Sequence, residues 1–100
     1  MIFELDDKNF TQAIKRGIKV VEFYMPNCPY CVREQKVLEG LDNIWIGKVN
    51  SHVSPNLIKE YDILSYPTFI IFNNGVEYTR FSGFRTREEL LDKFLKYIPR

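Results

Sequence analysis

A chain of 100 residues, 45% of them hydrophobic, can bury one core but hardly two, so we expect one domain over residues 1–100. The 14 Lys and Arg residues nearly balance the 13 Asp and Glu residues. This balance argues against the sustained positive field with which proteins bind nucleic acid or anionic lipid, so we expect neither a nucleic-acid nor a membrane partner.

The N-terminus, M-I-F-E-L-D-D-K, shows no targeting segment. It lacks a basic region followed by an apolar one, and no apolar run in the chain approaches the roughly 20 residues of a membrane span. We therefore expect a cytoplasmic protein. A secreted chain whose signal peptide had been removed would look the same.

The first part of the chain alternates between strand-like and helix-like segments. An extended start at 2–5 precedes a helix that Asp6 and Asp7 would cap and Gly17 would end. The run K-V-V-E-F-Y at 19–24 is rich in β-branched and aromatic residues and predicts a buried strand. The segment from Pro29 to about Leu41 predicts a helix, and its expected apolar face is formed by Val32, Val37, Leu38 and Leu41.

The second part begins with a strand at 44–50 and a short helix that starts at Ser54 and Pro55. N-N-G at 73–75 predicts the turn of a hairpin. Thr86 and Glu89 form a capping box at the start of an amphipathic C-terminal helix. The predicted order is β-α-β-α-β-α-β-β-α, with parallel crossovers first and an antiparallel hairpin last.

Both cysteines of the chain lie in N-C-P-Y-C, at the junction between a strand and a helix. A sulfur at a helix N-cap lies near unpaired N–H groups and the positive end of the helix dipole, which favours the thiolate. Cys28 is therefore the expected nucleophile. Cys31, one turn further in, is the expected resolving thiol, which would attack the mixed disulfide that Cys28 forms with a substrate.

Other interpretations of the cysteine pair carry less weight. A zinc site needs about four N or S ligands, and beyond the cysteines the chain offers His52 and carboxylates. A structural disulfide would close too short a loop to remove much chain entropy. An iron–sulfur cluster bridging two chains is harder to exclude, because each chain would supply only part of the ligand set. We expect no metal.

Nearly the whole chain resembles the thioredoxin family. The resemblance rests on four blocks in the family's order and spacing: V-V-E-F-Y-M-P-N-C-P-Y-C, G-K-V-N, I-L-S-Y-P-T-F-I-I-F-N-N-G and F-S-G-F. It implies the α/β thioredoxin fold, a central mixed β-sheet with helices on both faces. The tetrapeptide C-P-Y-C is similar to that of glutaredoxins, so a thioredoxin-like body carries a glutaredoxin-type active site.

Glu22 stands among apolar residues in what should be a central strand, where an isolated carboxylate is costly unless it is paired or protonated. By resemblance it lies beneath the resolving thiol and accepts the Cys31 proton as a general base. Lys48 matches the family's basic partner and would tune the charge state of Glu22. The alternatives are a Glu22 that points to solvent and a Lys48 that extends to the surface.

The resemblance also implies a substrate-binding edge. Pro67 matches the family's cis-proline, which leaves the backbone of Tyr66 free to pair with an extended substrate segment. Gly83 matches the glycine of a loop beside the active site, and Tyr30 would add to the docking surface. A trans proline at a strand start, a plain strand-end glycine and ordinary packing of the tyrosines are the alternatives.

The resulting hypothesis is a monomeric thiol-disulfide oxidoreductase that reduces protein disulfides through Cys28 and Cys31, contributes to cell redox homeostasis and electron transport, and has no cofactor but needs an external reductant. A thioredoxin reductase or glutathione would supply the electrons.

The active-site segment departs from both family patterns. Asn27 and Pro29-Tyr30 differ from the Trp and Gly-Pro typical of thioredoxins, and no Gly-Gly-x-Asp segment for glutathione is evident. A glutathione-dependent glutaredoxin-like enzyme is the alternative, followed by a non-catalytic scaffold or a cluster-bridged dimer.

Overall fold

The computed structural model describes residues 1–98. Its elements, in chain order, are β1 (Ile2–Leu5), α1 (Phe10–Ile14), β2 (Ile18–Tyr24), α2 (Pro29–Glu39), β3 (Ile46–Asn50), α3 (Pro55–Glu60), β4 (Thr68–Asn73), β5 (Val76–Ser82) and α4 (Arg87–Leu95). This is the predicted order of strands and helices.

The five strands form one mixed sheet in the order β1-β3-β2-β4-β5. β1 and β2 pair with β3 in parallel, whereas β4 pairs with β2 and β5 in antiparallel fashion. The predicted parallel crossovers and final hairpin are therefore confirmed. β2 lies at the centre of the sheet, so the segment that follows it begins at the end of a strand that is covered on both faces.

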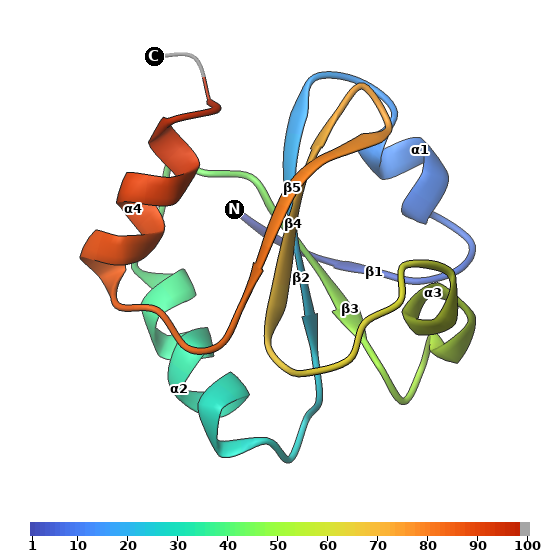
Figure 1. Cartoon of the computed structure of the whole chain (residues 1–100), viewed down its shortest axis with the longest axis horizontal. Coiled ribbons are helices and arrows are strands. Elements are labelled where there is room, and N and C mark those ends of the chain that lie inside the picture. The colour runs from blue at the N-terminus through green and yellow to red at the C-terminus, as the bar shows by residue number, and fades with distance from the viewer. Residues whose placement is uncertain (99–100) are drawn as a thin grey trace.

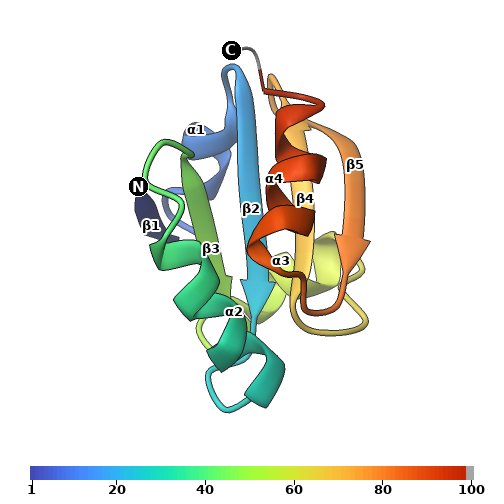
Figure 2. The same ribbon diagram turned by 90° about the vertical axis from the view of Figure 1, so that its left-hand side faces the viewer.

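Two helices cover each face of the sheet (Figures 1 and 2). On one face, α1 and α3 pack against the sheet through a cluster that includes Phe10, Phe23 and Leu57. On the other, α2 and α4 pack through Leu38 and Phe94. Burial on both faces explains why β2 reads as a nearly continuous apolar run rather than as an alternating one.

Two local predictions were wrong. α1 begins at Phe10 with Asn9 as its N-cap, because the carboxylate of Asp6 instead accepts hydrogen bonds from the backbone N–H groups of Lys8 and Asn9 in a preceding turn. Val32 was expected on the buried face of α2 but is exposed. The buried face is formed by Cys31, Glu34 and Leu38.

Other local signals agree with the structure. Asn74 and Gly75 adopt positive φ at the tip of the hairpin, and Thr86 and Glu89 form both hydrogen bonds of the capping box. Within residues 1–98, none of the helices has the length and apolar character needed to cross a bilayer.

Candidate active site

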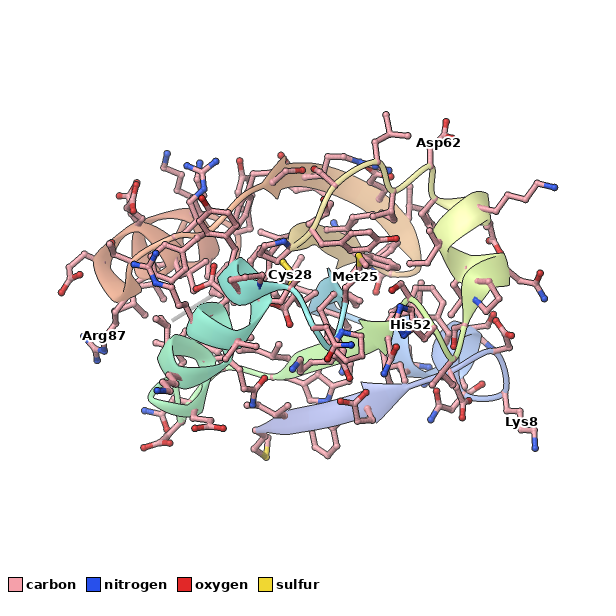
Figure 3. The ribbon with its side chains drawn as sticks, turned by 90° about the horizontal axis from the view of Figure 1, so that it is seen from below. Lys8, Met25, Cys28, His52, Asp62 and Arg87 are labelled. Carbon is pink, nitrogen blue, oxygen red and sulfur yellow. The ribbon has the colours of Figure 1, made fainter. Side chains whose placement is uncertain are left out.

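Cys28 is the N-cap of α2, and its sulfur occupies the position predicted from the sequence. Its Sγ accepts a hydrogen bond from the backbone N–H of Cys31 at 3.4 Å, while Pro29 fills the first helical position, where no N–H is needed. Cys28 is only partly buried, and Figure 3 shows it close to Met25 near the start of α2. The sulfur is thus accessible to a partner and receives an N–H donor, as a nucleophilic thiol requires.

Cys31 lies behind it and is buried, with only 5% of its surface exposed. Burial raises the pKa of its thiol to about 12, with smaller contributions in the same direction from the nearby Cys28 and Glu22. At neutral pH Cys31 is therefore a neutral thiol. It can act as a nucleophile only if a base removes its proton.

The segment before β4 closes over Cys28. The Tyr66–Pro67 peptide bond is cis, as the resemblance implies, and the carbonyl oxygen of Tyr66 lies 3.8 Å from the Cys28 Sγ. The carbonyl oxygen of Pro67 accepts a hydrogen bond of 2.9 Å from the backbone N–H of Gly83. Gly83 has a φ of 90°, a conformation that favours glycine. Three segments distant in sequence therefore meet at one end of the sheet.

Beneath the thiols, Glu22 and Lys48 face each other across the central pair of strands, where they are partners in the β2–β3 register. Both are buried, with 0% and 6% of their surfaces exposed, and Lys48 Nζ lies 3.7 Å from Glu22 Oε1. The expected burial of Glu22 is confirmed. Burial raises the pKa of Glu22 to about 7, although the charge of Lys48 opposes this rise.

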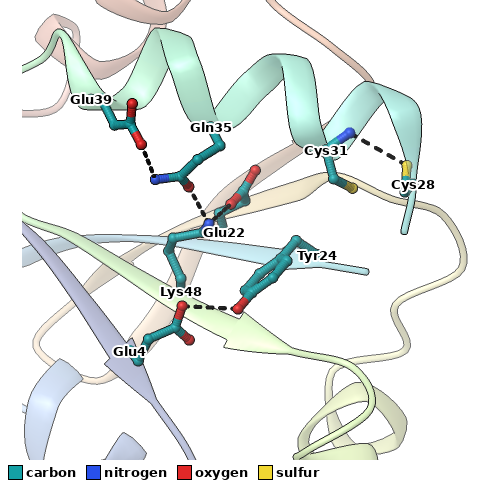
Figure 4. Close-up of polar contacts among 8 residues, drawn as sticks. All are labelled: Glu4, Glu22, Tyr24, Cys28, Cys31, Gln35, Glu39 and Lys48. Atoms are coloured by element: carbon teal, nitrogen blue, oxygen red, sulfur yellow. Dashed lines mark hydrogen bonds and ion pairs between the residues drawn. The ribbon is translucent and has the colours of Figure 1, made fainter. Parts of the chain in front are cut away.

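Contacts from α2 and β2 fix the position of Lys48 (Figure 4). Its Nζ donates to Gln35 Oε1 on α2 and lies 4.0 Å from the centroid of the Tyr24 ring. Gln35 in turn donates to Glu39 Oε2 at 3.1 Å. In contrast, neither carboxylate oxygen of Glu22 has a hydrogen-bond partner within the described residues. The Glu22 head group is thus free to accept a proton.

A groove of about 430 Å³ opens between α2 and the adjoining end of β2. It borders both Cys31 and the ammonium group of Lys48, and its walls are largely apolar. The other lining residues include Tyr24, Met25, Pro26 and Val32. This groove connects Cys31 and Lys48 to solvent.

Comparison of the sequence with known proteins identifies its family. The family model described as Thioredoxin matches residues 1–96. The chain is 31% identical to a thioredoxin of Staphylococcus haemolyticus (strain JCSC1435), over 94% of the chain and 98% of that protein. It is 36% identical to protein disulfide isomerase-like 5-1 of Oryza sativa subsp. japonica, over 89% of the chain and 67% of that protein.

The chain belongs to the thioredoxin family. It is also 35% identical to bloodstream-specific protein 2 of Trypanosoma brucei brucei, over 93% of the chain but only 20% of that longer protein. The predicted fold class is confirmed, and the relatives support thiol-disulfide oxidoreductase activity, with the cysteine pair close together in the structure. The enzyme class predicted from the sequence is therefore confirmed as well.

The thioredoxin fold brings the predicted site residues together at one end of the sheet. Cys28 and Tyr66 are partly exposed there, Pro67 is buried next to them, and Tyr30, with 57% of its surface exposed, stands beside Cys28 on the first turn of α2. Cys31, Glu22 and Lys48 are buried. His52 is exposed in the turn after β3, away from Cys28 (Figure 3).

The sequence analysis missed Glu34, a second fully buried carboxylate in this region. It lies on α2, and its Oε1 accepts a hydrogen bond of 2.9 Å from the backbone N–H of Arg85. Burial raises the pKa of Glu34 to about 7. An i+3 relation to Cys31 places it on the buried helix face and could have revealed it.

The part of the chain that the structure describes contains no group of three or more His, Cys, Asp or Glu residues arranged to hold a metal ion. The two thiols and the Glu22 carboxylate are the chemically reactive groups that the fold gathers here.

Proposed function

We propose that the chain reduces protein disulfides through reversible dithiol–disulfide exchange at Cys28 and Cys31. The observation that carries this proposal is the different burial of three groups at one end of the sheet. A partly exposed Cys28 lies at the N-cap of α2 and a buried Cys31 lies behind it. The carboxylate of Glu22, which faces Lys48 but accepts no hydrogen bond, lies beneath both.

In the first step the Cys28 thiolate attacks one sulfur of a substrate disulfide. The S–S bond of the substrate breaks, its second sulfur leaves as a thiolate, and a mixed disulfide joins Cys28 to the substrate. The Cys31 N–H that points at the Cys28 Sγ supports this step by stabilising negative charge on the attacking sulfur.

In the second step Glu22 accepts the proton of the Cys31 thiol. The resulting Cys31 thiolate attacks Cys28 Sγ, the substrate's remaining sulfur leaves, and the Cys28–Cys31 disulfide forms. Two electrons pass from the chain to the substrate. Lys48 holds the pKa of Glu22 lower than burial alone would, which keeps part of the carboxyl population ionised near neutral pH.

The substrate would bind as an extended segment along Tyr66, between Tyr30 and the loop that contains Gly83. Pairing of the substrate backbone with a free backbone edge gives affinity without demanding one sequence. Two exposed apolar side chains lie close in sequence to Cys28 and Tyr66, since Tyr30 is 57% and Leu64 is 90% exposed. This arrangement favours disulfides in unfolded or extended protein segments.

The proposal needs no metal or organic cofactor, because both electrons reside in the two thiols. An external donor must restore the dithiol after each cycle, and we propose a thioredoxin reductase for this role. A chain that reduces disulfides works where thiols are kept reduced, which favours the cytoplasm. We further propose that it acts as a monomer, since its proposed catalytic groups all come from one chain.

One observation favours a second function, glutathione-dependent exchange. Pro29 and Tyr30 form a glutaredoxin-type interior between the cysteines, and the exposed Tyr30 ring could contact a small thiol bound at Cys28. Electron supply by glutathione instead of a reductase would distinguish this alternative from the main proposal.

Reduction of insulin by the pre-reduced chain tests the proposal. Cys28→Ser should abolish the reaction, whereas Cys31→Ser should stop it at a mixed disulfide whose mass equals that of the chain plus one whole insulin molecule, because the second interchain disulfide of insulin stays intact. A Cys28→Ser variant that still reduces insulin would contradict the assignment of the nucleophile. A wild-type chain that binds but never reduces disulfide proteins would point to a scaffold.

A further inference from the structure

Glu34 is fully buried, yet its carboxylate is only half satisfied. Oε1 accepts the backbone N–H of Arg85, whereas Oε2 has no hydrogen-bond partner among residues 1–98. Burying such a group costs stability, and an apolar side chain of similar size would avoid that cost. The presence of Glu34 in the core therefore calls for an explanation other than stability.

The hydrogen bond joins α2 to the segment between β5 and α4, here called the 83–85 loop. A second contact reinforces it, since the guanidinium carbon of Arg33 lies 4.3 Å from the centroid of the Phe84 ring. At its other end the loop is tied to the substrate-binding edge, because the Gly83 N–H donates to the Pro67 carbonyl at 2.9 Å. The loop thus bridges α2 and Pro67.

These contacts form a closed ring that includes the reactive sulfur. Cys28 begins α2, Glu34 on α2 holds Arg85, the loop holds Pro67, and the carbonyl of the adjacent Tyr66 lies 3.8 Å from Cys28 Sγ. Within this ring, the hydrogen bond between Glu34 and Arg85 links α2 to the 83–85 loop. If it were lost, the loop could move relative to α2, and the edge that binds the substrate could move with it.

We propose that Glu34 is a positioning residue for disulfide exchange with protein substrates, which acts by fixing the 83–85 loop and Pro67 relative to Cys28. It touches neither the reacting sulfurs nor the substrate. The inference rests on the proposed function and deepens it, because it assigns substrate alignment and proton transfer to two different buried carboxylates.

Two variants separate the hydrogen bond from the charge. Glu34→Gln keeps an oxygen that can accept the Arg85 N–H but removes the negative charge, whereas Glu34→Met fills the same space without an acceptor. Glu88→Met removes an exposed carboxylate from α4, close to the same loop in sequence, and serves as the matched control.

The readout is the second-order rate constant for oxidation of each pre-reduced variant by insulin and by the small disulfide 5,5′-dithiobis(2-nitrobenzoate). We expect Glu34→Met to slow the reaction with insulin about tenfold, the effect of losing one charge-assisted hydrogen bond. The reaction with the small disulfide, which needs no extended pairing, should stay within about twofold. Glu34→Gln should restore the insulin rate, and Glu88→Met should leave both rates unchanged.

Equal losses with both disulfides, no loss with either, or a Glu34→Gln variant as slow as Glu34→Met would overturn the proposal. Should Glu34→Met fail to fold, amide hydrogen exchange of the wild-type chain decides. The Arg85 N–H should exchange at least about 100 times more slowly than an unprotected amide. Free exchange at Arg85 would refute the positioning role, whereas a wild-type chain inert towards both disulfides would refute the proposed function itself.

Discussion

Two regions of the site each bury one carboxylate, and they treat it differently. In the floor, formed by β2 and β3, Glu22 faces the ammonium of Lys48 and both its oxygens lack hydrogen bonds. In the side wall, where α2 meets the 83–85 loop, Glu34 accepts the backbone N–H of Arg85. Burial raises both pKa values to about 7. Equal burial therefore does not imply an equal role. Glu22, which accepts no hydrogen bond, can take up a proton, whereas Glu34 fixes the position of Arg85 through a hydrogen bond.

The largest expected effect is on stability, and it tests the raised carboxyl pKa that the two regions share. Both carboxyls have folded-state pKa values of about 7 against an ordinary value of 4.5, so the folded chain binds more protons between these pH values. The free energy of unfolding should therefore be highest below pH 4.5 and fall as pH rises to about 7, by at most about 3 kcal/mol for each carboxyl.

Urea unfolding at a series of pH values checks this trend. Glu22→Gln and Glu34→Gln should each flatten the pH dependence, and the double variant should flatten it most. A wild-type chain whose stability rises from pH 4.5 to pH 7 by the same amount as that of the double variant would show that neither carboxyl has a raised pKa.

Glu22→Gln has the next largest expected effect, and it tests a role, proton transfer, that we assign to the floor and not to the side wall. An amide cannot accept the Cys31 proton, so resolution of the mixed disulfide should slow about 100-fold. With 5,5′-dithiobis(2-nitrobenzoate), attack by Cys28 releases one coloured thiolate and resolution releases the second. Stopped-flow absorbance should show an unchanged first phase and a slow second phase. An unchanged second phase would exclude Glu22 as the base.

Lys48→Met sharpens the same distinction by changing only the electrostatics of the floor. In the wild type the second phase should accelerate as pH rises through about 7 and then level off, because the ionised form of Glu22 is the base. Without Lys48 the pKa of Glu22 should rise, moving the midpoint of this pH profile up by about 1 unit. A downward shift would contradict the proposed pairing.

Thr86→Ala has the smallest expected effect and tests whether the wall depends on Glu34 or on α4. Thr86 caps α4 directly after Arg85, and its hydroxyl accepts the Glu89 N–H at 3.2 Å. Losing the cap should lower the free energy of unfolding by about 1 kcal/mol. The rate with insulin should not change. If Thr86→Ala slowed the reaction with insulin as much as Glu34→Met, the N-terminus of α4 and not Glu34 would be what positions the 83–85 loop.

The sequence predicted much of the fold from local signals, such as an apolar strand that leads into the cysteines and N-N-G between two strands. The apolar neighbours of Glu22 were a local signal for its burial, whereas its pairing with Lys48 followed only from the resemblance to the thioredoxin family. The position of Cys31 on the inner side of α2 also followed from its spacing to Cys28.

The contact that forms the side wall was missed because nothing near Glu34 in the sequence encodes it. Glu34 interrupts no apolar run, and its partner is the backbone of Arg85, 51 residues away, which no side-chain pattern encodes. A related limitation of the sequence pattern explains why Val32 was wrongly predicted on the buried face of α2. Apolar residues alone defined that face in the sequence, whereas the fold turns Cys31 and Glu34 inward.

The reduction potential of the Cys28–Cys31 pair tests most directly whether the chain works as a reductase. The protein would be equilibrated in glutathione buffers and each redox species resolved by mass. We predict a potential near the thioredoxin value of about −270 mV, with no persistent glutathione adduct on Cys28. A potential above about −200 mV, or a stable adduct, would contradict the account and favour the glutathione-dependent alternative.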